Sequence, residues 1–315
     1  MSSLVRTLTP AKELKRARFD AADFDFHEIE MFFMRLGFAV LIFFTIKWEM
    51  GSLTSVKPDD AVGLAKFMDL TFLAHMKGVI FWQILTGLGL LAYVVGTLPA
   101  VGLLPALFFA IGTGTLDASR GADNHSTQLC TLILLGQFLV YAIPKMPREK
   151  LRRSSWLMPD TVIDRRAIYV SMVIFAACYV VSGWVKLQNS DWLWFHKVVP
   201  GLALELQKTN WSEYYDTLQP VPATLTSIVS LMNEHPFVAR LFFGCGLLLE
   251  LCAFLTLMGR RWALFYGLAL IIMHLSISHL MQLDFWYHIW AAVIFLLNLP
   301  GLRWTFGSGK RGAYV

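Results

Sequence analysis

Long apolar runs alternate with short polar stretches along most of the chain, and this pattern predicts helices that cross a membrane. Eight runs come close to the roughly 20 apolar residues that a spanning helix needs. They lie at about residues 29–48, 77–97, 98–117, 126–143, 166–186, 237–258, 261–280 and 285–300. The runs are continuous, whereas the strands of a membrane barrel alternate apolar and polar residues. We therefore expect an all-α, polytopic membrane bundle of about eight transmembrane helices.

The polar stretches divide the chain. Residues 1–28 form a basic N-terminal segment. Thr9 and Pro10 predict the start of a short helix that lies on the membrane surface. The alternative is that the segment is a solvated tail. Residues 29–300 form the transmembrane domain, and residues 301–315 form a tail. Loops at about 49–76 and 187–236 are long enough to cap one end of the bundle. In the second loop, the mildly apolar Thr224–Met232 portion is expected to lie on the membrane or to re-enter it.

Positive charge sets the expected orientation. Most lysines and arginines lie in the N-terminal segment, the 144–166 loop, the Arg260–Arg261 turn and the tail, which all fall on one side of the membrane. The positive-inside rule makes this side cytoplasmic. We expect an integral, multi-pass protein of the cell (inner) membrane with both termini in the cytoplasm. The net charge of +5 reflects these loops, so no nucleic-acid partner is expected.

Ionisable residues gather where the runs reach the extracytoplasmic side. These residues are Lys47, His75, Lys77, His125, Lys186, His274, His279 and His288. Because a lysine within a span costs roughly 2.5–3.5 kcal/mol, they predict an inward-facing site that opens to the outside. The cytoplasmic ends, dominated by arginine and lysine, carry no comparable group. A metal site is not expected, because His274 and His279 point about 140° apart on a helix.

A structural alternative exists for each of these residues. A lysine at the end of a span often anchors its ammonium in the headgroups. This alternative weighs equally with a chemical role for Lys186 and is favoured for Lys47 and Lys77. His279 and His288 fit a position at the membrane interface.

Four short motifs resemble those of a known family. The segments "SGWVKLQNSDW", "NHS" (124–126), "LLLELCAFL" and "MHLSISHLMQLDF" are similar, in order and spacing, to the membrane part of the vitamin K-dependent gamma-glutamyl carboxylases. The resemblance extends to the wider bacterial group of horizontally transferred transmembrane proteins. It covers most of the predicted membrane domain.

The resemblance implies a role for individual residues. Lys186 would be the base that deprotonates reduced vitamin K or menaquinol, to which O₂ then adds to form an epoxide. His125 and His274 would lie near the quinone oxygens. The strong base released by epoxidation would act on a glutamate of a secreted peptide or protein, with CO₂ as the trapping reagent. Residues expected to contact the substrate are Asn124, Trp184, Trp192, His279 and Glu250.

Departures from the family keep other functions open. The chain ends about 15 residues after its last predicted span, without the family's large lumenal portion, and Val185 and Glu250 replace a lysine and an aspartate of the animal enzymes. The quinol half of the reaction is therefore better supported than carboxylation. One alternative is a non-catalytic membrane factor for maturation or export of a secreted peptide. Another is a quinol oxidoreductase with a haem between His125 and His274.

Overall fold

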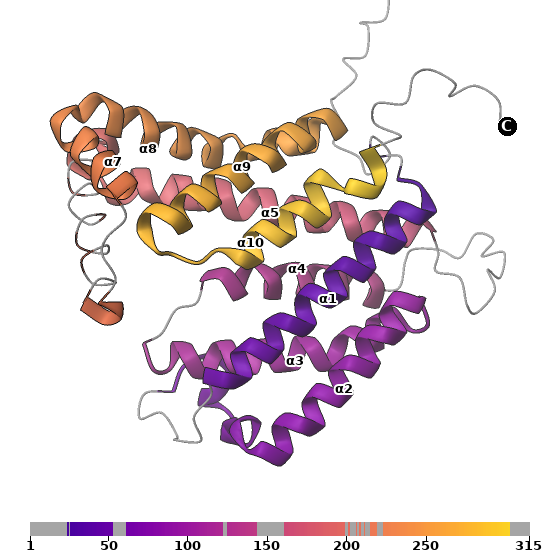
Figure 1. Cartoon of the computed structure of the whole chain (residues 1–315). Coiled ribbons are helices and arrows are strands. Elements are labelled where there is room, and N and C mark those ends of the chain that lie inside the picture. Colours follow the sequence, from indigo (N-terminus) through magenta and orange to yellow (C-terminus); the bar gives the residue numbers. More distant parts are fainter. Residues whose placement is uncertain are drawn as a thin grey trace, which may run out of the picture.

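The computed structural model describes residues 24, 26–52, 61–121, 125–143, 161–198, 201, 206, 208, 211, 215–218 and 223–302. All regular structure within these residues is helical (Figure 1). The α-helices are α1 (Glu28–Ser52), α2 (Met76–Val95), α3 (Pro99–Ala118), α4 (His125–Ala142), α5 (Thr161–Asn189), α7 (Ala223–Glu234), α8 (Pro236–Leu251), α9 (Arg260–Met281) and α10 (Trp286–Ala292). The short turns are η2 (Gly63–Lys66), η3 (Thr71–Ala74), η4 (Trp194–Val198), η5 (Ala253–Met258), η6 (Val293–Leu297) and η7 (Leu299–Gly301).

Five helices are long and apolar enough to cross a bilayer. They contain the segments Glu28–Lys47, Gly78–Val95, Pro99–Ala118, Val162–Asn189 and Arg260–Met281. Large side chains such as Phe44, Ile84 and Leu88 are exposed on these helices, as expected for a surface that faces lipid. The prediction of an all-α helical membrane bundle is confirmed. The other three expected spans form shorter helices, so the number of crossings stays a prediction.

Helices α2 and α3 form a tight hairpin. Gly96 and Leu98 both adopt the left-handed conformation, and Pro99 begins α3 at a position where a missing N–H costs nothing. A Cβ atom on Gly89 would lie only 2.4 Å from the carbonyl oxygen of Gly102. The two backbones therefore touch, which only glycine allows at this crossing.

The bundle has two groups of helices on either side of α4. Figure 1 shows α2 and α3 on one side of α4 and α5, α8, α9 and α10 on the other, with α1 running across both groups. Four fully buried rings, from Phe38, Phe109, Phe175 and Phe295, belong to one apolar core. Because these rings come from α1, α3, α5 and η6, the core joins both groups.

Two expected spans are not continuous α-helices. The 237–258 run becomes α8 followed by the 3₁₀ turn η5, in which the Thr256 hydroxyl donates a hydrogen bond to the carbonyl of Ala253. The 285–300 run becomes α10, the π-helical turn η6 and the 3₁₀ turn η7. The Thr224–Met232 portion of the long loop folds as most of α7, which packs on α8.

The expectation that buried ionisable groups gather only at one end is wrong. At the end where α1 and α9 begin, Glu30 is fully buried and accepts hydrogen bonds from Arg260 and Asn298. Nearby along the bundle, Asp164 pairs with Arg35 at 3.4 Å. These arginines lie inside the protein as partners of buried carboxylates, so charge near a span end does not always face the cytoplasm.

Candidate functional site

Lys186 and Glu250 form an ion pair between α5 and α8. The Lys186 ammonium donates to both carboxylate oxygens of Glu250, with Nζ at 2.5 Å from Oε1 and 2.7 Å from Oε2. The Glu250 side chain is only 9% exposed, whereas that of Lys186 is 36% exposed. The lysine therefore reaches inward to a buried carboxylate while one side of it stays accessible.

A glycine allows the two helices to approach at this pair. Gly183 lies one turn before Lys186, on the same face of α5. A Cβ atom at Gly183 would lie 3.0 Å from Leu251 Cγ and 3.2 Å from Glu250 Cβ. The missing side chain thus sets the distance between the lysine and its carboxylate.

A second polar group lies deeper along α5. The Tyr179 hydroxyl shares a hydrogen bond with Nε2 of His274 on α9, and both residues are buried. The ring of His288 on α10 lies 5.3 Å from the His274 ring and meets the Tyr179 ring edge-on at 6.0 Å. Phe285 covers the His274 ring at 4.9 Å. Three helices therefore supply one aromatic and imidazole cluster, here called the His274 cluster.

His274 has an unused hydrogen-bonding atom. Its side chain is buried, and Nδ1 has no hydrogen-bond partner among the described side chains. If the tyrosine donates to Nε2, a neutral ring carries its proton on Nδ1; if the ring donates, Nδ1 is an acceptor. In either form Nδ1 offers one hydrogen bond to a bound molecule.

The ion pair and the His274 cluster are neighbours. Tyr179 and Lys186 are seven residues apart, so they share a face of α5 with about 10 Å of axial rise between them. The arrangement offers a proton-accepting pair at the accessible end and hydrogen-bonding rings below it.

The expected site residues fall into three groups. Lys186, Glu250 and His274 come together as described. Trp184 and Trp192 pack edge-to-face on each other at 5.1 Å and are largely exposed, which suits an interface position. His279 is exposed near the end of α9, on a different face from His274. Asn124 and the side chain of His125 lie outside the described residues.

Two members of the site escape a reading of the sequence, because Tyr179 and Phe285 look like ordinary core aromatics. The sequence leaves His288 open between the site and the membrane interface, and in the structure its ring packs on that of His274. Helical spacing offers one signal, since Tyr179 lies two turns before Lys186. Phe285 ends the quoted motif "MHLSISHLMQLDF", but the motif does not show that its ring lies on His274.

The described residues contain no group of three or more histidine, cysteine, aspartate or glutamate side chains arranged to hold a metal ion. The site offers a ligand the Lys186–Glu250 ion pair, the hydrogen-bonding groups of the His274 cluster and apolar rings. No family model, curated protein or solved structure matches the chain. The resemblance to the gamma-glutamyl carboxylases therefore stays a prediction.

Proposed function

We propose that this chain is a membrane enzyme that deprotonates a lipid-soluble hydroquinone and directs its oxygenation to an epoxide. The observation that carries the proposal is the pairing of Lys186 with the buried Glu250, beside the His274 cluster. A lysine that anchored in the headgroups would extend outward and would not contact a buried carboxylate. Ionisable residues inside a membrane bundle are costly, and one that stays accessible, as Lys186 does, is a candidate for a functional role.

The pair acts as one base. Lys186 and Glu250 share a single proton, either as ammonium and carboxylate or as amine and carboxylic acid. When the hydroquinone hydroxyl gives up its proton, the pair gains a second one and becomes ammonium and carboxylic acid. Glu250 thus stores the proton, while the exposed side of Lys186 contacts the substrate and pairs with the quinolate that forms.

His274 and Tyr179 position the other quinol oxygen. The free Nδ1 of His274 meets a hydroxyl or a developing oxyanion, and Tyr179 fixes the ring through Nε2. In the overall reaction, the hydroquinone and O₂ yield the quinone epoxide and water. One oxygen atom enters the epoxide, and the other leaves as water after taking up the two quinol protons.

The resemblance extends the proposal to an acceptor. The alkoxide formed during epoxidation is a strong base, and in this proposal it removes a proton from a glutamate of a secreted peptide before leaving as water. In this coupled reaction the water takes one quinol proton and the glutamate proton, and the Lys186–Glu250 pair releases the other quinol proton to solvent. Addition of CO₂ to the carbanion would complete carboxylation. Vitamin K or menaquinone would be the quinone, and the site would face the extracytoplasmic side, as the distribution of lysine and arginine predicts.

The test is oxygen uptake by the purified protein in lipid nanodiscs supplied with menaquinol, with the epoxide measured in parallel. Replacing Lys186 with glutamine keeps an amide donor for Glu250 but removes the basic half of the pair, which contacts the substrate. We expect the rate to fall about 10²- to 10⁴-fold, the range for loss of a general base. The matched control is Lys47→Ala, which replaces an exposed lysine near the C-terminal end of α1. This variant is expected to keep the wild-type rate.

Two outcomes contradict the proposal. Wild-type turnover by Lys186→Gln, with unchanged thermal unfolding, would remove the assigned base. If the wild-type protein consumes no oxygen with menaquinol or reduced vitamin K but forms a stable complex with a secreted peptide, the non-catalytic maturation or export factor is the better assignment.

A further inference from the structure

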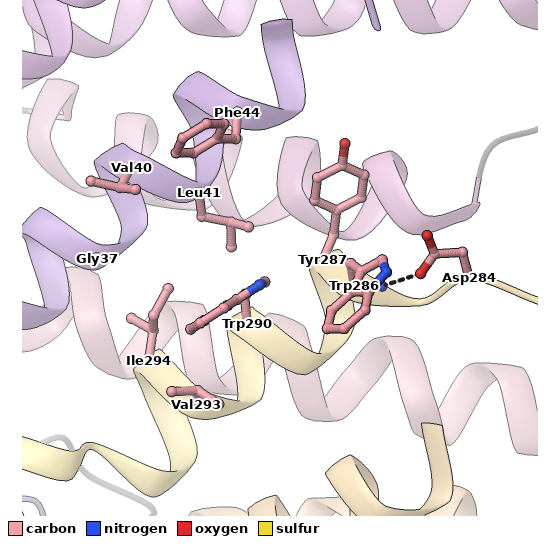
Figure 2. Close-up of a pocket in the computed structure, with 10 residues that line it drawn as sticks. All are labelled: Gly37, Val40, Leu41, Phe44, Asp284, Trp286, Tyr287, Trp290, Val293 and Ile294. Carbon is pink, nitrogen blue, oxygen red and sulfur yellow. Dashed lines mark hydrogen bonds between the residues drawn. The ribbon is translucent and has the colours of Figure 1, made fainter. Parts of the chain in front are cut away.

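A groove of about 720 Å³ lies between α1 and the α10–η6 segment (Figure 2). Its volume falls within the roughly 300–1,000 Å³ of typical ligand sites. Val40 and Phe44 line it from α1, and Trp286, Tyr287 and Trp290 line it from α10. Asp284, just before α10, is the single charged residue among the described residues of the lining.

Backbone geometry creates this groove. A Cβ atom on Gly37 would lie 3.1 Å from Ile294 Cγ1, so α1 and η6 touch at this point. Figure 1 shows the two segments diverging from there toward the start of α10. Val293 and Ile294, at the narrow end, belong to the π-helical turn η6, a feature that is often associated with functional sites.

The groove opens sideways toward lipid. Val40, Phe44, Trp286 and Trp290 are each about half exposed, and α1 is one of the helices that are long enough to span the membrane. Besides the Asp284 carboxylate, the polar side-chain groups of the described lining are the Tyr287 hydroxyl and the indole N–H groups of Trp286 and Trp290; the rest of the wall is hydrocarbon and aromatic surface. A ligand that fills it must therefore carry a long apolar chain and arrive from the bilayer.

Asp284 determines which head group suits the groove. Its Oδ1 accepts a hydrogen bond from the backbone N–H of Trp286 at 3.2 Å, which holds the carboxylate at the wide end (Figure 2). A carboxylate repels a phosphate head group and accepts a hydrogen bond from a hydroxyl. A phospholipid is thus disfavoured relative to an uncharged, hydroxyl-bearing amphiphile.

The wide end of the groove is also connected to the candidate site. Phe285 follows Asp284 directly, and its ring covers His274 at 4.9 Å and meets His288 at 5.4 Å. We propose that the groove binds the apolar chain of an isoprenoid hydroquinone, whose head donates a hydrogen bond to Asp284 beside the Phe285 cover of His274. The choice of a quinol head rests on the proposed function; the position of the chain does not.

The test measures binding without turnover. Full-length protein in nanodiscs is equilibrated anaerobically with two tritiated probes: a naphthohydroquinone with a four-isoprene chain, and menadiol, which lacks the chain. Val40→Phe fills the groove and is expected to weaken binding of the chained probe about tenfold, because it displaces apolar contact, while menadiol binding is unchanged. Val101→Phe, at an exposed valine of α3 outside the groove, is the control and should change neither.

A second variant tests the role of charge. Asp284→Lys replaces the carboxylate with a cation. This variant should bind the chained hydroquinone more weakly than the wild-type protein does. It should also keep the anionic lipid dioleoylphosphatidylglycerol bound during purification. Equal binding of the chained probe by Val40→Phe and Val101→Phe would overturn the proposal. So would phosphatidylglycerol retained by the wild-type protein and lost from Val40→Phe.

The two proposals fail in different ways. If Val40→Phe binds the chained probe normally while turnover still depends on Lys186, the groove assignment is wrong and the enzyme assignment stands. If Val40→Phe loses the probe but Lys186→Gln keeps full turnover, the groove stands and the base is wrong.

Discussion

Glu30 and Glu250 are both buried carboxylates paired with a basic side chain, but they lie toward opposite ends of the bundle and have different surroundings. Glu30 accepts hydrogen bonds from Arg260 Nη1 at 3.2 Å, Arg260 Nη2 at 2.6 Å and Asn298 Nδ2 at 2.9 Å. The Arg260 side chain is 13% exposed and the Glu30 side chain is fully buried. Glu250 contacts Lys186, whose side chain is 36% exposed.

The difference separates a structural pair from a reactive one. An arginine does not give up its proton in proteins, and its planar group holds a carboxylate at two points, so the Glu30 pair fixes α1 against α9. A lysine is a compact charge that can act as a base, and here it has an accessible side. We therefore expect mutations at Glu30 to affect stability and mutations at Glu250 to affect turnover.

The largest stability effect is expected from Glu30→Gln. Removing the carboxylate leaves Arg260 buried with a neutral partner, and breaking a buried pair in this way costs roughly 3–5 kcal/mol. Glu250→Gln should cost less stability, because water can reach the freed Lys186, but it should abolish quinol oxidation. Thermal unfolding and oxygen uptake of both variants in nanodiscs check the contrast. Equal losses of stability in the two variants would contradict the distinction between a structural Glu30–Arg260 pair and a reactive Glu250–Lys186 pair.

A smaller effect is expected where α5 approaches α8. Gly183→Ala places a Cβ atom 3.0 Å from Leu251 Cγ, which forces α8 and Glu250 to shift and costs about 1–3 kcal/mol by overpacking. Turnover should fall about three- to tenfold as Glu250 moves relative to Lys186.

Gly114→Ala provides the matched control for that substitution. Gly114 is also inside a helix, but a Cβ atom there meets nothing within 4 Å. We expect a gain of about 0.5–1 kcal/mol from the better helix former and no change in turnover. If Gly183→Ala leaves turnover unchanged while it lowers stability, the position of Glu250 does not limit the reaction.

The smallest effect is expected from Tyr179→Phe, which removes the hydroxyl that bonds His274. Loss of one neutral hydrogen bond costs about 0.5–1.5 kcal/mol of stability. The same cost applies to Tyr93→Phe, because the Tyr93 hydroxyl donates to Gln137 Oε1 at 2.6 Å in a different part of the core. Only the Tyr179 variant should slow turnover. Equal rates for the two variants in the oxygen assay would exclude a role for Tyr179 in orienting His274.

The fold could be predicted where it depends on local sequence. The length of an apolar run determines whether a helix can cross a bilayer, so α1, α2, α3, α5 and α9 all lie where the runs predict them. The turn between α2 and α3 follows from Gly96 and Pro99. The break after Leu251 and the π-helical η6 leave no trace in hydropathy, because their residues are as apolar as the rest of the run.

The sequence predicts individual residues of the site but not which of them contact one another. Lys186 and Glu250 were each named from the sequence, but their pairing joins residues 64 positions apart. Glu30 and Arg260 are 230 positions apart, and each alone is typical of a helix end near the membrane surface. Hydropathy and motif patterns report what a residue is, whereas these pairs depend on how helices cross.

The lateral opening between α1 and α10 has a consequence for how ligand supply is measured. A ligand that enters there is counted per phospholipid, not per volume of water. Diluting a vesicle suspension with buffer would leave occupancy unchanged, whereas adding phospholipid at constant ligand would lower it. The dissociation constant for this groove is therefore expressed as a mole fraction of ligand in the lipid. The composition of the bilayer then determines the occupancy of the groove.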